Sequence, residues 1–138
     1  MPIIKPFKLE IKDKEIKDLN MRLLNTRLPD QGPGEPWKTG TDLEWFKKLL
    51  EYWKTDFDWK SSENKLNSFP QFKTQISDIG VHYIHCEGKG TKNIPLLLMH
   101  GWPGSVFEFL DLIPILTDPK KFGIETDIAF TVIANFLG

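Results

Sequence analysis

The sequence predicts a mixed α/β fold in which a helical N-terminal arm precedes the first half of a sheet. Apolar residues recur at helical spacing through residues 13–53, and strand-like alternation follows in the second half. A compact apolar run, Ile94–Met99, then leads into a turn at 100–105 that contains glycine and proline. We therefore expect a helical arm over residues 1–68 and the start of a sheet, truncated before it is complete, over residues 69–138.

The arm is expected to hold two main helices separated by a loop. The first begins near Asp13, a suitable N-cap, and runs to Arg27, just before a proline that ends it. Three glycines and two prolines predict a loop at 30–40. The spacing of 41–44 is that of a capping box in front of the second helix, and a short third helix is expected near 61–66. Aromatic residues at helical spacing here favour core packing over a ligand site.

The second half is expected to form a hairpin followed by a strand–helix–strand unit. The elements are strands at 72–77, 81–86 and 95–99, a helix at 106–116, and a last strand at 127–134. The first two strands alternate in polarity and flank a turn, which predicts an antiparallel hairpin. The third strand is apolar on both faces, as expected inside a parallel sheet. The helix that follows it predicts a right-handed crossover to the last strand.

Composition and charge exclude several classes of function. A net charge of −1 gives no electrostatic reason to expect nucleic acid or an anionic membrane as a partner. A single cysteine, Cys86, cannot form a disulfide framework and suits a reducing compartment. Residues 1–5 are too short and too soon charged for a signal peptide, and no segment approaches the ~20 apolar residues that span a bilayer. We expect a cytoplasmic chain with no membrane anchor.

Three potential metal ligands, His82, His85 and Cys86, lie on one predicted strand. Side chains alternate between the faces of a strand, so the two histidines point opposite ways while Cys86 sides with His82. Three ligands cannot converge from these positions, and we expect no metal site but histidines on the surface of a hairpin. The glycine pairs at 32–34 and 88–90 lack a phosphate-binding pattern and are expected to be loops, so no cofactor is predicted either.

The strongest candidate for chemistry is the turn His100–Ser105, with the sequence His-Gly-Trp-Pro-Gly-Ser. Because it joins a buried strand to a helix, its backbone N–H groups are expected at the carboxyl end of the sheet, where they can receive a developing oxyanion. Gly101 lets the backbone pass close to a ligand, and Pro103 fixes φ, with Trp102–Pro103 a candidate cis bond. The alternative interpretation is a tight turn that binds nothing.

No nucleophile accompanies this turn. A nucleophile elbow needs Gly-x-Ser, Gly-x-Cys or Gly-x-Asp followed by x-Gly between a strand and a helix, and no segment fits. Ser105 does not have a glycine two positions before it and two positions after it, and the aspartates at 111, 118 and 127 lack these glycines as well. Since His100 belongs to the turn, no histidine is left as a general base late in the chain, and no catalytic triad can be assembled.

Several segments match one known family when taken in order. They are Asp18–Asp30, Tyr52–Trp59, Leu66–Lys73, Val81–His85, His100–Ser105 and Leu116–Pro119. On these segments the chain resembles the microsomal-type epoxide hydrolases, including the juvenile hormone epoxide hydrolases of insects, to about residue 133. The resemblance implies the N-terminal region of an α/β-hydrolase, with an arm that wraps the core and its lid, and a role in the catabolism of xenobiotic or aromatic compounds.

The resemblance also implies a reaction in two steps. An aspartate attacks a carbon of a small apolar epoxide to form an ester, and water activated by a histidine then hydrolyses the ester to give a vicinal diol. Lid tyrosines polarise the epoxide oxygen. Only the oxyanion turn of this machinery maps onto the chain: the backbone N–H of Trp102 is the donor, Gly101 and Pro103 shape the turn, and His100 is positional and not a base. Neither a cofactor nor a metal is implied.

The aspartate, the histidine, its acidic partner and the lid tyrosines lie beyond Gly138 in the family, and from Asn135 the chain departs from the family's Pro-Ser-x-Pro-Gly-like loop. We therefore expect the chain alone to be inactive. The alternative hypothesis is a non-catalytic module that packs on or regulates a full-length relative. The nucleotide sequence downstream of the codon for Gly138 would separate these hypotheses. Part of an epoxide hydrolase predicts that the family pattern continues there, whereas a separate module predicts a true stop codon. A truncated sheet is also expected to self-associate.

Overall fold

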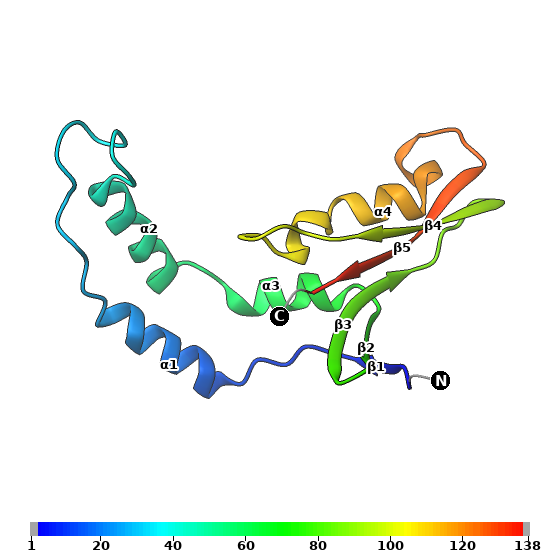
Figure 1. Cartoon of the computed structure of the whole chain (residues 1–138), viewed down its shortest axis with the longest axis horizontal. Coiled ribbons are helices and arrows are strands. Elements are labelled where there is room, and N and C mark those ends of the chain that lie inside the picture. The colour runs from blue at the N-terminus through cyan, green and yellow to red at the C-terminus, as the bar shows by residue number, and fades with distance from the viewer. Residues whose placement is uncertain (1–2, 137–138) are drawn as a thin grey trace. The chain divides into compact units, whose positions relative to one another are not determined.

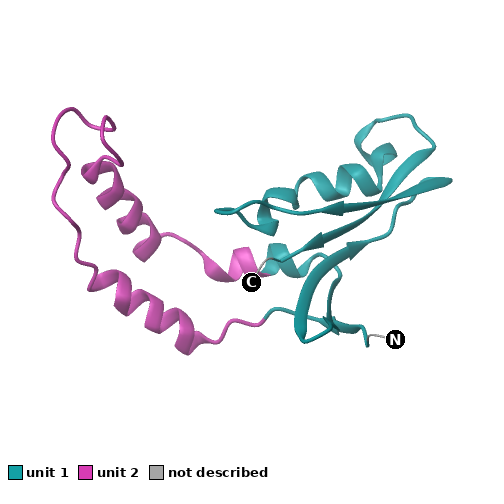
Figure 2. Cartoon of the chain, viewed as in Figure 1, with its two compact units in different colours: residues 1–9, 64–138 teal, residues 10–63 magenta. Residues whose placement is uncertain are grey.

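A computed structural model describes residues 3–136 (Figure 1). Its elements are β1 (Lys5–Phe7), α1 (Asp13–Leu24), α2 (Leu43–Thr55), α3 (Trp59–Asn67), β2 (Gln71–Ile76), β3 (Ile79–Cys86), β4 (Lys92–Leu98), α4 (Leu112–Thr117) and β5 (Ile128–Asn135), with short 3-10 helices η1 (Val106–Phe109) and η2 (Pro119–Phe122). The backbone forms two compact units, residues 10–63 and residues 1–9 with 64–138 (Figure 2). The domain boundaries expected from the sequence, 1–68 and 69–138, stay a prediction.

The helices of the first unit begin and end where local side chains satisfy their free backbone groups. The N-cap of α1 is Lys12, one residue before the predicted Asp13, and its backbone N–H donates to the Glu15 carboxylate at 3.0 Å. The helix ends before the predicted Arg27: the Asn25 N–H still donates to the Met21 carbonyl, but the next N–H, of Thr26, turns to the Leu23 carbonyl at 3.3 Å, and the Asn25 side chain adds a bond to the Met21 carbonyl. Sequence spacing therefore identifies this helix but misplaces both of its ends.

The second helix, α2, is capped by Asp42, whose carboxylate accepts from the Trp45 N–H at 2.8 Å. The predicted capping box of 41–44 is therefore wrong: the N-cap lies one residue later than Thr41, and the residue three positions after it is Trp45, which has no acceptor to complete a box. The predicted loop at 30–40 is confirmed, and α3 is the predicted third helix, longer at both ends. No helix between residues 3 and 136 is long and apolar enough to cross a bilayer.

The sheet has the strand order β1-β2-β3-β5-β4. The pairs β1–β2, β2–β3 and β3–β5 are antiparallel, whereas β4 pairs parallel with β5. The predicted hairpin is confirmed, with Ile76 opposite Ile79 across a two-residue turn, and so is the parallel crossover from β4 through α4 to β5. The edge strand β1 comes from the N-terminal segment, which helical and strand spacing alone do not predict.

The predicted single helix at 106–116 is two elements, η1 and α4. Pro114 gives the physical reason, since it has no N–H to donate to the Leu110 carbonyl and its ring would clash there. Val106, Leu110 and Ile113 are nevertheless all buried in the core, and the half-buried Phe109 packs against it. They pack with buried residues of α3 and the sheet, namely Leu66, Ile84, Val132 and Ala134.

Within residues 3–9 and 64–136, the helical residues pack on the core face of the sheet, and the opposite face carries none of them. A groove of about 430 Å³ runs across this face, lined among others by Tyr83, Leu97 and Met99. On the outer side of β4, no strand of the described chain pairs with its backbone. The predicted interior strand is thus an edge strand here, with free backbone groups beside exposed apolar side chains.

This open edge predicts self-association when the chain is expressed alone. Light scattering should show oligomers, and Leu97→Lys, a charge on the uncovered face, should reduce them. Met21→Lys is the matched control, because Met21 in α1 is as exposed as Leu97, at 57% against 59%. A monomer with a cooperative thermal melt for the unaltered chain would contradict the prediction.

Candidate functional site

The turn His100–Ser105 lies where the parallel strands end. In the register of β4 and β5, Leu98 is opposite Ala134, so the turn follows β4 at the edge where β5 also reaches its carboxyl end. Figure 1 shows β4 and β5 running side by side with α4 alongside them. The structure therefore places the turn at the sheet edge predicted from the sequence, the usual location of sites in such sheets.

The first half of the turn is held by a contact between neighbouring residues. The Nδ1 atom of the His100 ring lies 3.0 Å from the carbonyl oxygen of Gly101. A carbonyl only accepts, so a hydrogen bond at this contact requires a hydrogen on Nδ1. The predicted cis bond between Trp102 and Pro103 is confirmed, and the Trp102 side chain is 94% exposed. Neither the sheet nor the loop hydrogen bonds of residues 3–136 use the Trp102 N–H.

The second half of the turn is held by a capping box at the start of η1. The Ser105 hydroxyl accepts from the Phe107 N–H at 3.0 Å, and the Glu108 carboxylate accepts from the Ser105 N–H at 3.1 Å. These two bonds satisfy backbone donors that a helix start leaves free. The Ser-x-x-Glu spacing of 105–108 is visible in the sequence and is the signal that would identify Glu108 as part of this turn.

Crowding within the turn falls on Gly104. A Cβ there would lie 2.6 Å from the Gly101 carbonyl oxygen and 2.5 Å from the Glu108 carboxylate, whereas a Cβ at Gly101 would meet no described atom within 4 Å. The backbone geometry thus requires glycine at 104, which sequence patterns do not single out. The roles predicted for Gly101 and for the Trp102 N–H concern a bound ligand, and they stay predictions.

This difference between the two glycines can be tested directly. Gly104→Ala should lower the free energy of unfolding by about 1–3 kcal/mol, because the backbone oxygen of Gly101 must move. Gly101→Ala should change it by less than about 0.5 kcal/mol. Urea denaturation of both variants in the Leu97→Lys background measures the two values. Equal stabilities would show that the turn is not packed in this way.

The three potential metal ligands are spread over both faces of β3. His85 lines the groove on the uncovered face, whereas Cys86 packs against the core. Residues 3–136 hold no cluster of three or more histidine, cysteine or acidic side chains that could bind a metal. Burial raises the pKa of the Cys86 thiol. The separation of these side chains agrees with the alternation predicted from the sequence.

His82 is not the surface histidine that the sequence predicts. Its ring stacks on Phe136, with centroids 3.7 Å apart, and meets Phe7 edge-on at 4.6 Å. Its Nε2 atom donates to the side-chain oxygen of Gln71 at 3.0 Å. Burial, and then the nearby Lys73 ammonium, lower the pKa of His82 to about 4. The ring is therefore neutral near pH 7 and belongs to the packing of the sheet.

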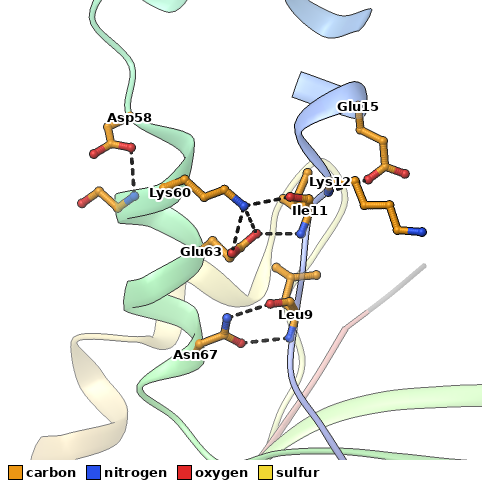
Figure 3. Close-up of polar contacts among 9 residues, drawn as sticks. Leu9, Ile11, Lys12, Glu15, Asp58, Lys60, Glu63 and Asn67 are labelled. Atoms are coloured by element: carbon orange, nitrogen blue, oxygen red, sulfur yellow. Dashed lines mark hydrogen bonds and ion pairs between the residues drawn. The ribbon is translucent and has the colours of Figure 1, made fainter. Parts of the chain in front are cut away.

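Gln71 and Asn67 extend this contact to the N-terminal segment. The Gln71 amide donates to the Asn67 side-chain oxygen at 3.0 Å, and the Asn67 amide makes two hydrogen bonds, of 2.9 and 2.8 Å, to the backbone of Leu9 (Figure 3). Within residues 10–63, Ile11 is held similarly by Glu63 and Lys60. The bonds to the backbone of Leu9 and Ile11 join residues 49 to 58 positions apart, so spacing along the sequence cannot reveal them.

The lowered pKa of His82 predicts a pH dependence of stability. The unfolded chain, with an ordinary value of 6.5, binds a proton that the folded chain binds only near pH 4. Stability should therefore fall as the pH falls from 6.5 to 4, with no further loss from this group below that range. His82→Gln should flatten the dependence in urea denaturation. A parallel pH profile in His82→Gln would contradict the assignment.

A helical arm, an antiparallel hairpin and a parallel crossover, in this strand order, define the first half of an α/β-hydrolase sheet. Among solved structures, the juvenile hormone epoxide hydrolase of the silkworm Bombyx mori superimposes with a TM-score of 0.85 at 32% identity, over 100% of this chain and 37% of that one. An epoxide hydrolase of Aspergillus niger gives 0.81 at 28% identity, over 97% and 35% of the two chains.

The family model for the epoxide hydrolase N terminus matches residues 4–109, and the chain belongs to this family. Epoxide hydrolase 1 of Oryctolagus cuniculus is 43% identical over 134 residues, which are 94% of this chain and 30% of the relative. Juvenile hormone epoxide hydrolase 1 of Ctenocephalides felis is 38% identical over 120 residues, 85% and 26% of the two chains. The chain thus spans about 30% of the length of the curated relatives that it matches.

Proposed function

We propose that this chain supplies the arm, the first half of the sheet and the oxyanion turn of an epoxide hydrolase, which converts an epoxide and water to a vicinal diol. The observation that carries the proposal is the turn at 100–105. It follows the parallel strand β4 at the carboxyl edge of the sheet, and the Trp102 N–H is not used by the rest of residues 3–136. Membership of the epoxide hydrolase N-terminus family supports the same reaction.

In the proposed reaction an aspartate outside this chain attacks an epoxide carbon. The ring C–O bond breaks and the epoxide oxygen takes up a proton, so the charge of this step develops on the substrate. A histidine outside this chain then takes a proton from water, which attacks the carbonyl carbon of the aspartyl ester, and the carbonyl oxygen becomes an oxyanion. The ester C–O bond breaks, the leaving group regains the proton from the histidine, and the diol departs as the oxyanion collapses to the carboxylate. A backbone N–H aimed at that oxygen lowers the barrier of the second step alone. The turn is thus assigned to ester hydrolysis.

The substrate is a small apolar epoxide, and the reaction belongs to the catabolism of xenobiotic or aromatic compounds. We place it in the cytoplasm, because Cys86 is the one cysteine of the chain and suits a reducing compartment. Neither nucleic acid nor a membrane is assigned as a partner, since the net charge of −1 provides no attraction to either. A second copy of the chain is assigned as a partner when the second half of the sheet is missing.

The test joins residues 1–134 to the second half of a full-length relative. The 138-residue chain alone should give no diol from styrene oxide, whereas the chimera should turn it over. In the chimera, Gly104→Ala should slow ester hydrolysis by up to ~10²–10³, the usual cost of one oxyanion donor, and the ester should accumulate as a mass increase equal to the substrate. Gly80→Ala is the matched control, because Gly80 lies in the hairpin outside the turn and an added Cβ there would meet no described atom within 4 Å.

Three results would overturn the proposal. Loss of ester formation in a folded Gly104→Ala chimera would assign the turn to the first step and not to the second. A folded chimera that never forms the ester would favour the alternative, a non-catalytic module that packs on a full-length relative. Diol formation by the 138-residue chain alone would contradict the proposal that the nucleophile lies outside this chain.

A further inference from the structure

We propose that His100 is a positioning residue that orients the oxyanion donor by hydrogen bonding to the Gly101 carbonyl. The inference rests on the proposed function and adds to it the means by which the donor is aimed. The carbonyl of Gly101 and the N–H of Trp102 belong to the same peptide unit. This unit is planar, and among the described residues the one cis bond is the next, between Trp102 and Pro103. Fixing the Gly101 oxygen therefore fixes the direction of the Trp102 N–H.

Other parts of the described chain give this peptide little support. The strand β4 ends at Leu98, before the turn, so the sheet ladder does not reach the peptide. The space where a Cβ of Gly101 would lie has no atom within 4 Å. A glycine peptide in such a position can rotate with little steric cost. A specific contact is therefore needed to hold it in one orientation.

Two contacts meet at the Gly101 oxygen. The Nδ1–H of His100 donates to it at 3.0 Å, and Gly104 packs so close to it that an added Cβ would be 2.6 Å away. The ring thus attracts the oxygen from one side while the backbone of Gly104 limits it from another. A hydrogen bond at the carbonyl also polarises the peptide, which strengthens its N–H as a donor by about 10–30%. His100 acts through the peptide and does not touch the reacting atoms.

Substitutions of His100 can separate the effect of its hydrogen-bond donor from the effect of the size of its ring. Asn places an amide N–H close to the position of Nδ1, Leu has the shape of Asn without the donor, and Asp offers only acceptors to the Gly101 oxygen. We expect His100→Asn to hydrolyse the ester nearly as fast as the unaltered chimera. His100→Leu and His100→Asp should be slower by about 10- to 100-fold, less than the loss of a whole donor. Ester formation should be unchanged in all three.

The measurement is a single turnover of styrene oxide followed by intact mass, which times the rise and the decay of the ester separately. A purely structural defect would slow both steps and would not be rescued by Asn. Equal decay rates in His100→Asn and His100→Leu, or an unaltered rate in His100→Leu, would overturn the inference. If the unaltered chimera forms no ester, the proposed function fails instead, and the two failures are distinguishable.

A second measurement does not depend on activity. In the 138-residue chain carrying Leu97→Lys, ¹⁵N labelling of histidine should show the hydrogen of neutral His100 at Nδ1. The residual dipolar coupling of the Trp102 N–H should keep its value in His100→Asn and change in His100→Leu. A hydrogen at Nε2, or a coupling that does not respond to His100→Leu, would overturn the inference whatever the chimera does.

Discussion

The parallel pairing of β4 with β5 is the constraint on which the rest of the structure depends. Two parallel neighbours cannot be joined by a tight turn, so the chain must cross over one face of the sheet and return. The crossover contains α4, and it brings the carboxyl ends of both strands to one edge. The turn at 100–105 lies at that edge for this reason, and a hairpin connection would have left no such turn there.

The crossover is held by a small apolar core. Leu110 and Ile113 above the sheet, and Ile84 and Val132 within it, are almost completely buried. Each side chain of this size stabilises the fold by about 1.5–3 kcal/mol when it leaves water. Pro114 interrupts the crossover and splits it into η1 and α4, yet the buried face continues across the break. Packing onto the sheet therefore decides the path of the crossover, and helical continuity is secondary.

Features that depend on neighbouring residues could be predicted from the sequence, and features that depend on distant ones could not. The alternation of 72–77 and the apolar run before His100 identify the hairpin and the parallel strand, because one local pattern determines each. The strand β1 and the contact of Asn67 with Leu9 escape such patterns, since the partners lie about 60 residues apart. Helix ends can be predicted only to within a few residues, because several nearby side chains could each cap the same helix.

The same distinction explains why the turn can hold its shape without the second half of the proposed hydrolase. Its contacts link His100 to Gly101, Gly104 to Gly101, and Ser105 to Glu108, so all of them lie within nine consecutive residues. None of them needs a nucleophile or a lid. The exposed Trp102 side chain and the apolar groove beside β4, by contrast, are not held by contacts of this local kind. The donor's direction is therefore a local property of this chain, whereas the site that would use it is assembled by distant contacts.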